Sequence, residues 1–317
     1  MSNAPITHID PAAFRADPYP DLAKMRTSSP ITYVPELDAT LITRRDEIYT
    51  QEKRTDVFSS LQPDGLMTRL MGENMMRKDG TDHMAERRAL FPALSPKTVR
   101  AHWLPKFQSA AAELLETLHP LGQCDLVADF AMPLSGEALK AITGLTNMRA
   151  AEMDRVSQGM IDGCANYASD PVIEANCHNC TASIDTHIDA RINALTVNPD
   201  RSALSVQLAA GLSMETTRAN IKLIISGGQN EPRDAIAGTI YALLANPDER
   251  AKIDAETATW ANAFDEYLRW NSPIGMSPRR IARDAAAVDT TADDQQVIIE
   301  ILRHELPLNR LALLRGV

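Results

Sequence analysis

The stretch LIISGGQNEPRDAIAGTIYALLANPDE, Leu223 to Glu249, decides the fold. Its apolar residues recur at three- and four-residue spacing, which predicts a long helix within 215–246. The middle of the stretch reads GGQNEP, where each Gly costs about 1 kcal/mol and the Pro about 3 kcal/mol of helix stability relative to Ala. We therefore expect a long central helix that opens locally. A bulky ligand that binds beside the opening would explain why the helix contains so weak a segment.

The composition of GGQNEP predicts what the opening offers to a ligand. Pro232 has no N–H, so the carbonyl of Gly228, four residues back, loses its helical partner. Gly227 and Gly228 lack side chains, which lets a flat group approach the backbone closely. The expected result is a groove with a free carbonyl, flanked by Asn230 and Glu231. A plain proline kink, or two helices separated by a loop, is the alternative.

Helical periodicity dominates the chain from Thr81 onward. The predicted helical segments are 82–91, 97–118, 135–143, 149–165, 178–195, 215–246, 248–255 and 258–270. Before them we expect a short helix at Asp21 to Arg26 and a hairpin built from Ile31–Val34 and Thr40–Thr43. The fold class is therefore mainly α, with a small β portion near the N-terminus and no sign of a second globular domain. The segment from Gln296 to Arg303 fits a helix or a strand and stays unassigned.

Composition limits the classes of function. The chain has 317 residues, 44% of them hydrophobic, which is enough for a large core. Its 32 Lys and Arg against 42 Asp and Glu give a net charge of −10, which argues against nonspecific nucleic-acid binding. The sequence shows no signal peptide and no apolar stretch of the roughly 18 residues that a membrane span needs. We expect a soluble cytoplasmic protein with neither nucleic-acid nor membrane partners.

TDHMAERRALF, Thr81 to Phe91, carries a pair of cationic donors. His83 and Arg87 are four residues apart on a predicted helix, so both project from one face. Such a pair suits a dianionic ligand, for example two propionates, because Arg binds carboxylates bidentately. The alternative is a solvated helix face on which Glu86 pairs locally.

AFDEYLRWNSPIGMSPRRIARD, Ala263 to Asp284, carries a second set of charges. Glu266 and Arg269 lie three residues apart and can pair, either on the surface for a few tenths of a kcal/mol or partly buried. Two prolines forbid a helix in the segment that follows. There, Arg279 and Arg280 are expected to point into the core or at an anionic ligand.

The four cysteines are Cys124, Cys164, Cys177 and Cys180. The last two form CHNC, whose C-x-x-C spacing occurs in zinc and redox sites. A zinc site needs a second pair of ligands, and a redox motif needs a strand–helix context, and the sequence offers neither. We interpret these thiols as structural residues that pack like small hydrophobic side chains.

Taken in order, these motifs resemble the cytochrome P-450 family of haem-thiolate monooxygenases, from about Asp10 to Asp284. DHMAERRALFPALSP resembles the helix whose H-x-x-x-R pattern contacts the haem propionates. ISGGQNEPRDAIAGTIYALLANPDE resembles the long distal helix, where a Gly-rich groove receives dioxygen. EYLR resembles the E-x-x-R signature, and SPRRIARD resembles the strand whose Arg reaches a propionate. The resemblance implies a P-450-like helical domain over 1–284, followed by a tail, 285–317, of uncertain structure.

The resemblance also implies site residues and a cofactor, heme b. Its binding residues would be His83, Arg87, Gly227, Gly228 and Arg280, with Glu266 and Arg269 as the structural pair. Asn230 and Glu231 stand where the family has its catalytic acid–alcohol pair, so Glu231 would organise water and protons. A substrate pocket is implied near Leu66, Met67, Ile225 and Ile274.

Within the family, SGGQNEPRDAI and EYLRWNSPIGMSPRR look most like bacterial aromatic O-demethylases such as guaiacol demethylase. The implied reaction uses dioxygen to hydroxylate an aryl methyl ether, and the hemiacetal then loses formaldehyde. Electrons would come from NAD(P)H through a separate flavin or iron–sulfur reductase, because no motif of either kind occurs here.

One departure from the family is an absence. The haem-ligand loop, F-x-x-G-x-x-x-C-x-G, has no counterpart, and no cysteine follows Cys180. We therefore interpret the chain as C-terminally incomplete and identify no metal ligand in it. If it binds haem at all, we expect it to do so without cysteinate ligation, and we expect no reductase-driven demethylation. The alternative is a non-catalytic helical haem-binding protein, or a degenerate fragment with no enzymatic activity.

Overall fold

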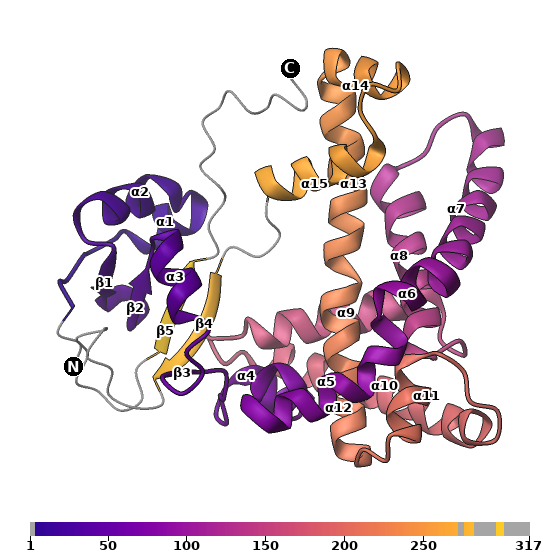
Figure 1. Cartoon of the computed structure of the whole chain (residues 1–317), viewed down its shortest axis with the longest axis horizontal. Helices are drawn as coiled ribbons and strands as arrows, with labels where there is room; N and C mark the ends of the chain where they lie inside the picture. The colour runs from indigo at the N-terminus through magenta and orange to yellow at the C-terminus, as the bar shows by residue number, and fades with distance from the viewer. Residues whose placement is uncertain (1–3, 272–275, 282–295, 301–317) are drawn as a thin grey trace. The chain divides into compact units, whose positions relative to one another are not determined.

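The computed structural model describes residues 4–271, 276–281 and 296–300, which fall into two compact units (Figure 1). The sheet unit takes its described residues from 1–62, 78–80 and 268–317. The helical unit comprises 63–77 and 81–267. The predicted division at residue 284 remains a prediction, because the two units interleave along the sequence.

The sheet unit contains five strands in the order β1-β2-β5-β4-β3. The first two, β1 (Ile31–Val34) and β2 (Ala39–Ile42), form the predicted antiparallel hairpin. The third in sequence, β3 (Phe58–Ser59), pairs antiparallel with β4 (Met276–Ile281). The last, β5 (Gln296–Glu300), pairs parallel with β2 and antiparallel with β4.

The small β portion expected near the N-terminus is present, and the sheet also takes strands from the C-terminal part of the chain. Two of the five strands lie after residue 275 and join the hairpin through β5. A short apolar run such as QVIIE does not distinguish helix from strand by its own pattern. Its pairing with β2 decides the matter, and that contact joins residues far apart in sequence.

Short helices accompany the strands of the sheet unit. They are α1 (Pro11–Ala16), α2 (Tyr19–Ser28) and α3 (Arg45–Gln51). Asp10 caps α1, since its carboxylate accepts from the backbone N–H groups of Ala12 and Ala13. The second helix is longer than the predicted 21–26. Apolar residues of α1, α2 and the hairpin form one core, namely Ile9, Phe14, Leu22, Met25, Val34 and Leu41.

The helical unit contains every helix that periodicity predicted. In chain order the helices are α4 (Leu66–Met71), α5 (Gly80–Leu94), α6 (Pro96–Thr98), α7 (Leu104–Leu118), α8 (Met132–Thr143), α9 (Ala150–Cys164), α10 (Pro171–Val197), α11 (Ala203–Ala209), α12 (Met214–Gly228), α13 (Asn230–Ala245), α14 (Pro247–Asp254) and α15 (Trp260–Trp270). Two π-helical turns precede α7 and α8, at Val99–Trp103 and Leu126–Ala131. Two helices, α4 and α11, were not predicted because each is too short to show a period.

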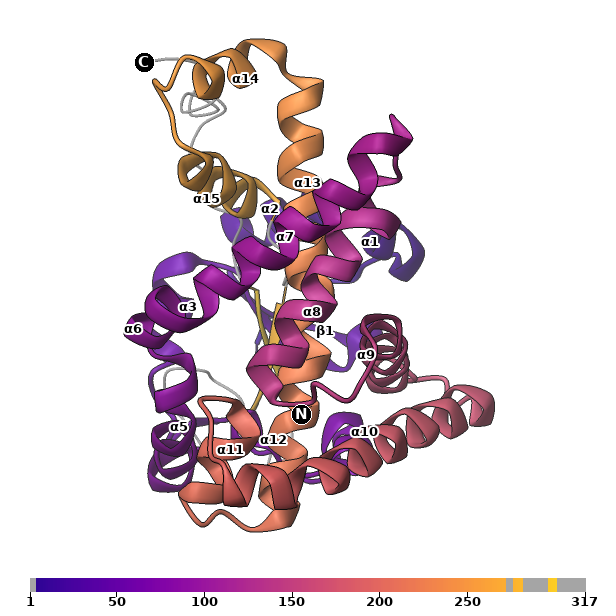
Figure 2. The same ribbon diagram turned by 90° about the vertical axis from the view of Figure 1, so that its right-hand side faces the viewer.

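The helices α12 and α13 form a column through the helical unit, and α8 and α9 pack against it (Figure 2). The main core lies where α12 meets α9, α10 and α4. Its largest members include Leu145, Met148, Met153, Met160, Ile184, Ile221 and Ile225. This packing fixes one side of the column, and hence which of its residues remain available for a site.

The cysteines of CHNC pack between α9 and α10. A Cβ on Gly163 would lie 2.6 Å from Sγ of Cys177, and a Cβ on Gly159 would overlap Sγ of Cys180. Each thiol therefore fills a notch that a glycine leaves open. Burial raises the pKa of the Cys177 thiol to about 11, which keeps it protonated. This is the structural role that the sequence predicts.

Two kinds of feature are absent from the described part of the chain. None of its helices combines the length and the apolar character that crossing a bilayer requires. It also contains no group of three or more His, Cys, Asp and Glu side chains that could hold a metal ion.

Candidate functional site

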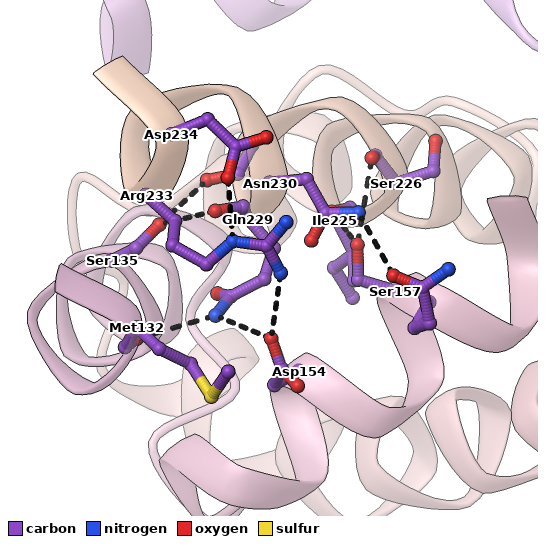
Figure 3. Close-up of polar contacts among 12 residues, drawn as sticks. Met132, Ser135, Asp154, Ser157, Ile225, Ser226, Gln229, Asn230, Arg233 and Asp234 are labelled. Atoms are coloured by element: carbon purple, nitrogen blue, oxygen red, sulfur yellow. Dashed lines mark hydrogen bonds and ion pairs between the residues drawn. The ribbon is translucent and has the colours of Figure 1, made fainter. Parts of the chain in front are cut away.

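The column breaks at Gln229, between the end of α12 at Gly228 and the start of α13 at Asn230 (Figure 3). Gln229 keeps helical backbone angles, with φ −98° and ψ −54°. The break is therefore a single residue, and the chain continues in the same direction. Pro232 lies in the first turn of α13, where a missing N–H is tolerated.

The carbonyls at the break are not free. The Ser135 hydroxyl, on α8, lies 2.8 Å from the carbonyl oxygen of Gln229 and 3.3 Å from that of Gly228, within donating distance of both. The expectation of a free Gly228 carbonyl is thus wrong. A hydroxyl from another helix supplies the donor that Pro232 lacks.

Side chains from α8 and α9 fix the same side of the break (Figure 3). The Gln229 amide is fully buried and donates to the carbonyl of Met132 and to Asp154, both at 3.3 Å. Asp154 also lies 3.7 Å from the guanidinium of Arg233. One carboxylate on α9 therefore ties together residues before and after the Asn230–Glu231 pair.

The other side of the break carries an exposed glycine and a carboxyl group. Gly227 is exposed, and among the described residues a Cβ placed on it would meet only Oε1 of Glu231, at 3.9 Å. The Oε2 atom of Glu231 is buried and has no hydrogen-bond partner among the described residues. Burial raises the pKa of this carboxyl. A hydrogen bond from the backbone N–H of Glu231 and the positive charge of Arg233 lower the pKa, the negative charge of Asp234 raises it, and the net shift is upward. Such a group is suited to holding and releasing a proton.

Three expected site residues instead face the packed side of the column. A Cβ on Gly228 would lie 2.8 Å from Leu139 of α8, so this glycine serves helix packing. Ile225 is fully buried in the core, which removes it from the expected pocket. The Asn230 amide lies 3.4 Å from Gln158 of α9, so Glu231 is the member of the pair beside Gly227.

Helix α5 carries the two predicted cationic donors. The ring of His83 is half-buried, and its Nδ1 lies 2.9 Å from the carbonyl oxygen of Met75. A carbonyl only accepts, so Nδ1 carries a proton. Arg87 is exposed and forms no ion pair within the described residues. Glu86 is only 5% exposed and accepts from Asn220, so it does not belong to a solvated face.

The remaining predicted residues have mixed outcomes. Leu66 and Met67 open helix α4 and pack half-buried against the core. Arg280 lies on β4 of the sheet unit, opposite Ser59 of β3. On α15, the burial of Glu266 is confirmed at 6% exposed. Its pairing with Arg269 stays a prediction, and Ile274 lies outside the described residues.

These groups fit part of a haem site. An imidazole and an exposed guanidinium, one helical turn apart, provide donors for two carboxylates. The open face at Gly227 leaves room for a flat group, with a proton-holding carboxyl beside it. Cys177 and Cys180 do not complete the set, because their thiols fill glycine notches between α9 and α10.

Comparison with known proteins agrees with this fit. No protein-family profile matches the chain. It is 24% identical over 324 residues to the cytochrome P-450 CYP199A2 of Rhodopseudomonas palustris, which covers 95% of this chain and 75% of that protein. It is 22% identical over 280 residues to pulcherriminic acid synthase of Bacillus subtilis, covering 86% and 68%. Crystalline CYP109E1 from Bacillus megaterium, with testosterone, superposes with a TM-score of 0.77 at 19% identity, covering 92% and 77%.

The chain resembles the bacterial cytochrome P-450 family over most of its length. Its mainly helical fold is the P-450 fold. Members of the family are haem-dependent oxidoreductases that receive electrons from a separate reductase. The resemblance inferred from four ordered motifs is thereby confirmed at the level of family, fold and cofactor.

Sequence reasoning missed the residues that hold the α12–α13 column in place. Ser135 and Asp154 form hydrogen bonds with Gln229 of the column. Asn220, on α12, accepts a hydrogen bond from the backbone N–H of Met75. A weak signal existed for Asn220, a polar residue directly before the apolar run IKLII, Ile221 to Ile225. Nothing in the sequence indicates its partners.

Proposed function

We propose that this protein is a P-450-type monooxygenase that carries out oxidative O-demethylation or hydroxylation of a small aromatic substrate. The observation that carries the proposal is the Glu231 carboxyl beside the exposed Gly227, at the break of the distal helix. The ether preference rests on the likeness of SGGQNEPRDAI and EYLRWNSPIGMSPRR to aromatic O-demethylases.

The residues divide into binding and proton-handling groups. Haem, when bound, supplies the activation of dioxygen, while the protein supplies position and protons. His83 and Arg87 would hold its carboxylates through charge-assisted hydrogen bonds. Glu231 would hold a proton at its carboxyl, and Ser135 and Asp154 would keep the helix break, and so this carboxyl, in place.

The overall reaction balances as follows for an aryl methyl ether. One oxygen atom of dioxygen enters a C–H bond of the methyl group, and the other leaves as water. Two electrons from NAD(P)H, delivered by a separate reductase, and two protons complete that water. The hemiacetal then breaks its bond between the methyl carbon and the aryl oxygen, giving a phenol and formaldehyde.

Binding of a methoxyarene tests the substrate class. The haem-loaded chain is titrated with guaiacol and, as a matched control, with catechol, which lacks the methyl group. We expect guaiacol to perturb the haem absorption spectrum at lower concentration than catechol. Equal responses to both compounds would refute the ether preference and leave the haem assignment intact.

A pH titration tests the role of Glu231. With guaiacol bound, the spectrum of the wild type should show a transition above the ordinary carboxyl range, because burial raises the pKa of Glu231. Glu231→Gln should abolish the transition, whereas Glu215→Gln, at an exposed position of α12, should keep it. A transition that survives in Glu231→Gln would remove this residue from the site.

A non-catalytic haem-binding protein is the second candidate. The packing of Cys177 and Cys180 between α9 and α10 favours it, because those thiols are not available to an iron. The difference spectrum of the reduced, carbon-monoxide-bound protein separates the two functions. A thiolate-ligated haem gives a distinctive red-shifted band, and a haem without thiolate does not.

A further inference from the structure

A buried amide on the distal helix links that helix to the segment in front of α5. Asn220 of α12 is fully buried, and its Oδ1 accepts from the backbone N–H of Met75 at 2.8 Å. The chain approaches α12 closely here because Gly72, with φ 91°, packs against Ala219. A Cβ on Gly72 would lie 3.2 Å from the Ala219 Cβ, and only glycine adopts that φ readily.

The same amide also anchors α5 itself. The Nδ2 of Asn220 donates to Oε2 of Glu86 at 2.8 Å and to Oε1 of Gln207 at 3.2 Å. Glu86 is 5% exposed and Gln207 is fully buried. Glu86 lies one helical turn after His83 on α5. Hydrogen bonds between buried groups of this kind are costly to break, since each lost partner leaves an unsatisfied polar atom.

Both connections meet at His83. Asn220 holds the N–H of Met75, and the carbonyl of the same residue accepts from Nδ1 of His83. Asn220 also holds Glu86, on the helix that bears the imidazole. With Nδ1–H committed to the backbone, the ring presents Nε2 to a ligand.

We propose that Asn220 is a positioning residue for His83, which it holds, through Met75 and Glu86, with Nδ1–H donating to the backbone, so that Nε2–H of the imidazolium is directed to donate to a haem carboxylate. The inference rests on the proposed role of His83 in haem binding. It goes beyond that role because it gives the distal helix control over a contact made by α5.

The first measurement uses the haem-free chain, so it does not depend on the proposed function. Nitrogen NMR of histidine-labelled protein reports which ring nitrogen of His83 carries the proton. We expect Nδ1–H in the wild type and its loss in Asn220→Leu. The control is Asn166→Leu, because Asn166 is also buried but bonds to the backbone of Asp170 instead.

The second measurement is haem release to an excess of apomyoglobin. Asn220→Leu should release haem on the order of 10-fold faster than Asn166→Leu, the size expected for losing one charge-assisted hydrogen bond. Unchanged Nδ1–H in Asn220→Leu, or equal release from both variants, would overturn the proposal. If the chain does not bind haem, the proposed function fails while the NMR result still decides the positioning role.

A polarity swap keeps the test valid if Asn220→Leu does not fold. In Asn220→Asp, the new carboxylate still accepts from Met75 but faces Glu86, a like charge. Adding Glu86→Gln provides a donor, so the hydrogen bond re-forms with its direction reversed. The double variant should recover Nδ1–H at His83 and wild-type haem release. Failure of the double variant to improve on Asn220→Asp would also overturn the proposal.

Discussion

Removing the Ser135 hydroxyl should expose the defect that Pro232 creates in the distal helix. In Ser135→Ala, the Gly228 carbonyl keeps no donor, because residue 232 has no N–H to give it. The Gln229 carbonyl keeps only a long hydrogen bond, 3.4 Å from the N–H of Arg233. A buried acceptor without a partner costs about 1–3 kcal/mol, so we expect a loss of that size in the free energy of unfolding.

A double-mutant cycle isolates this mechanism. Pro232→Ala restores an N–H that can donate to Gly228, so Ser135→Ala should cost at least about 1 kcal/mol less in that background. The assay is equilibrium urea unfolding of the haem-free chain, followed by helical circular dichroism. Ser157 provides the control, because its hydroxyl bonds to the carbonyls of Ile225 and Ser226, whose helical donors are not prolines.

The cycle can fail in two ways. A coupling below about 0.5 kcal/mol between Ser135→Ala and Pro232→Ala would mean that the hydroxyl does not replace the missing N–H. An equal coupling for Ser157→Ala would mean that Pro232→Ala reorganises the whole break. Either result would refute the role of Ser135 as the donor that replaces the missing N–H of Pro232.

Three further predictions concern haem and pH. Arg87→Ala should weaken haem retention by roughly 1.5–3 kcal/mol and Lys97→Ala by little, and equal effects in a haem-release assay would refute the propionate assignment. The Arg155 guanidinium holds the pKa of Glu152 at about 2, against an ordinary 4.5, so this carboxylate stabilises the fold above pH 4.5 and its contribution is lost as the pH falls through about 2. The unfolding free energies of wild type and Glu152→Gln should therefore converge on acidification, and a constant difference would contradict the pairing. The difference spectrum of the reduced, carbon-monoxide-bound chain should lack the thiolate band. Observing this band, and losing it when one of the four cysteines is replaced by Ser, would overturn the prediction.

Motif order, more than any single motif, carried the family assignment. His83, Arg87, the GGQNEP break and Glu266 were all found because each sits in a local pattern whose spacing places it on a helix. The roles of Gly228 and Ile225 were misjudged for a common reason. Their side of the helix faces α8 and α9, and a helix sequence does not say which neighbour covers which face.

The sequence by itself determined the helices of the column, the weak point at GGQNEP and the donors on α5, because periodicity, glycine, proline and charge act over a few residues. Only the tertiary structure decided what each of these does. The Gly228 carbonyl receives its donor from Ser135, 93 residues away, and Met75 receives its acceptor from Asn220, 145 residues away. Such bonds form because a buried polar group must find a partner, and the packing of the helices selects which partner is near.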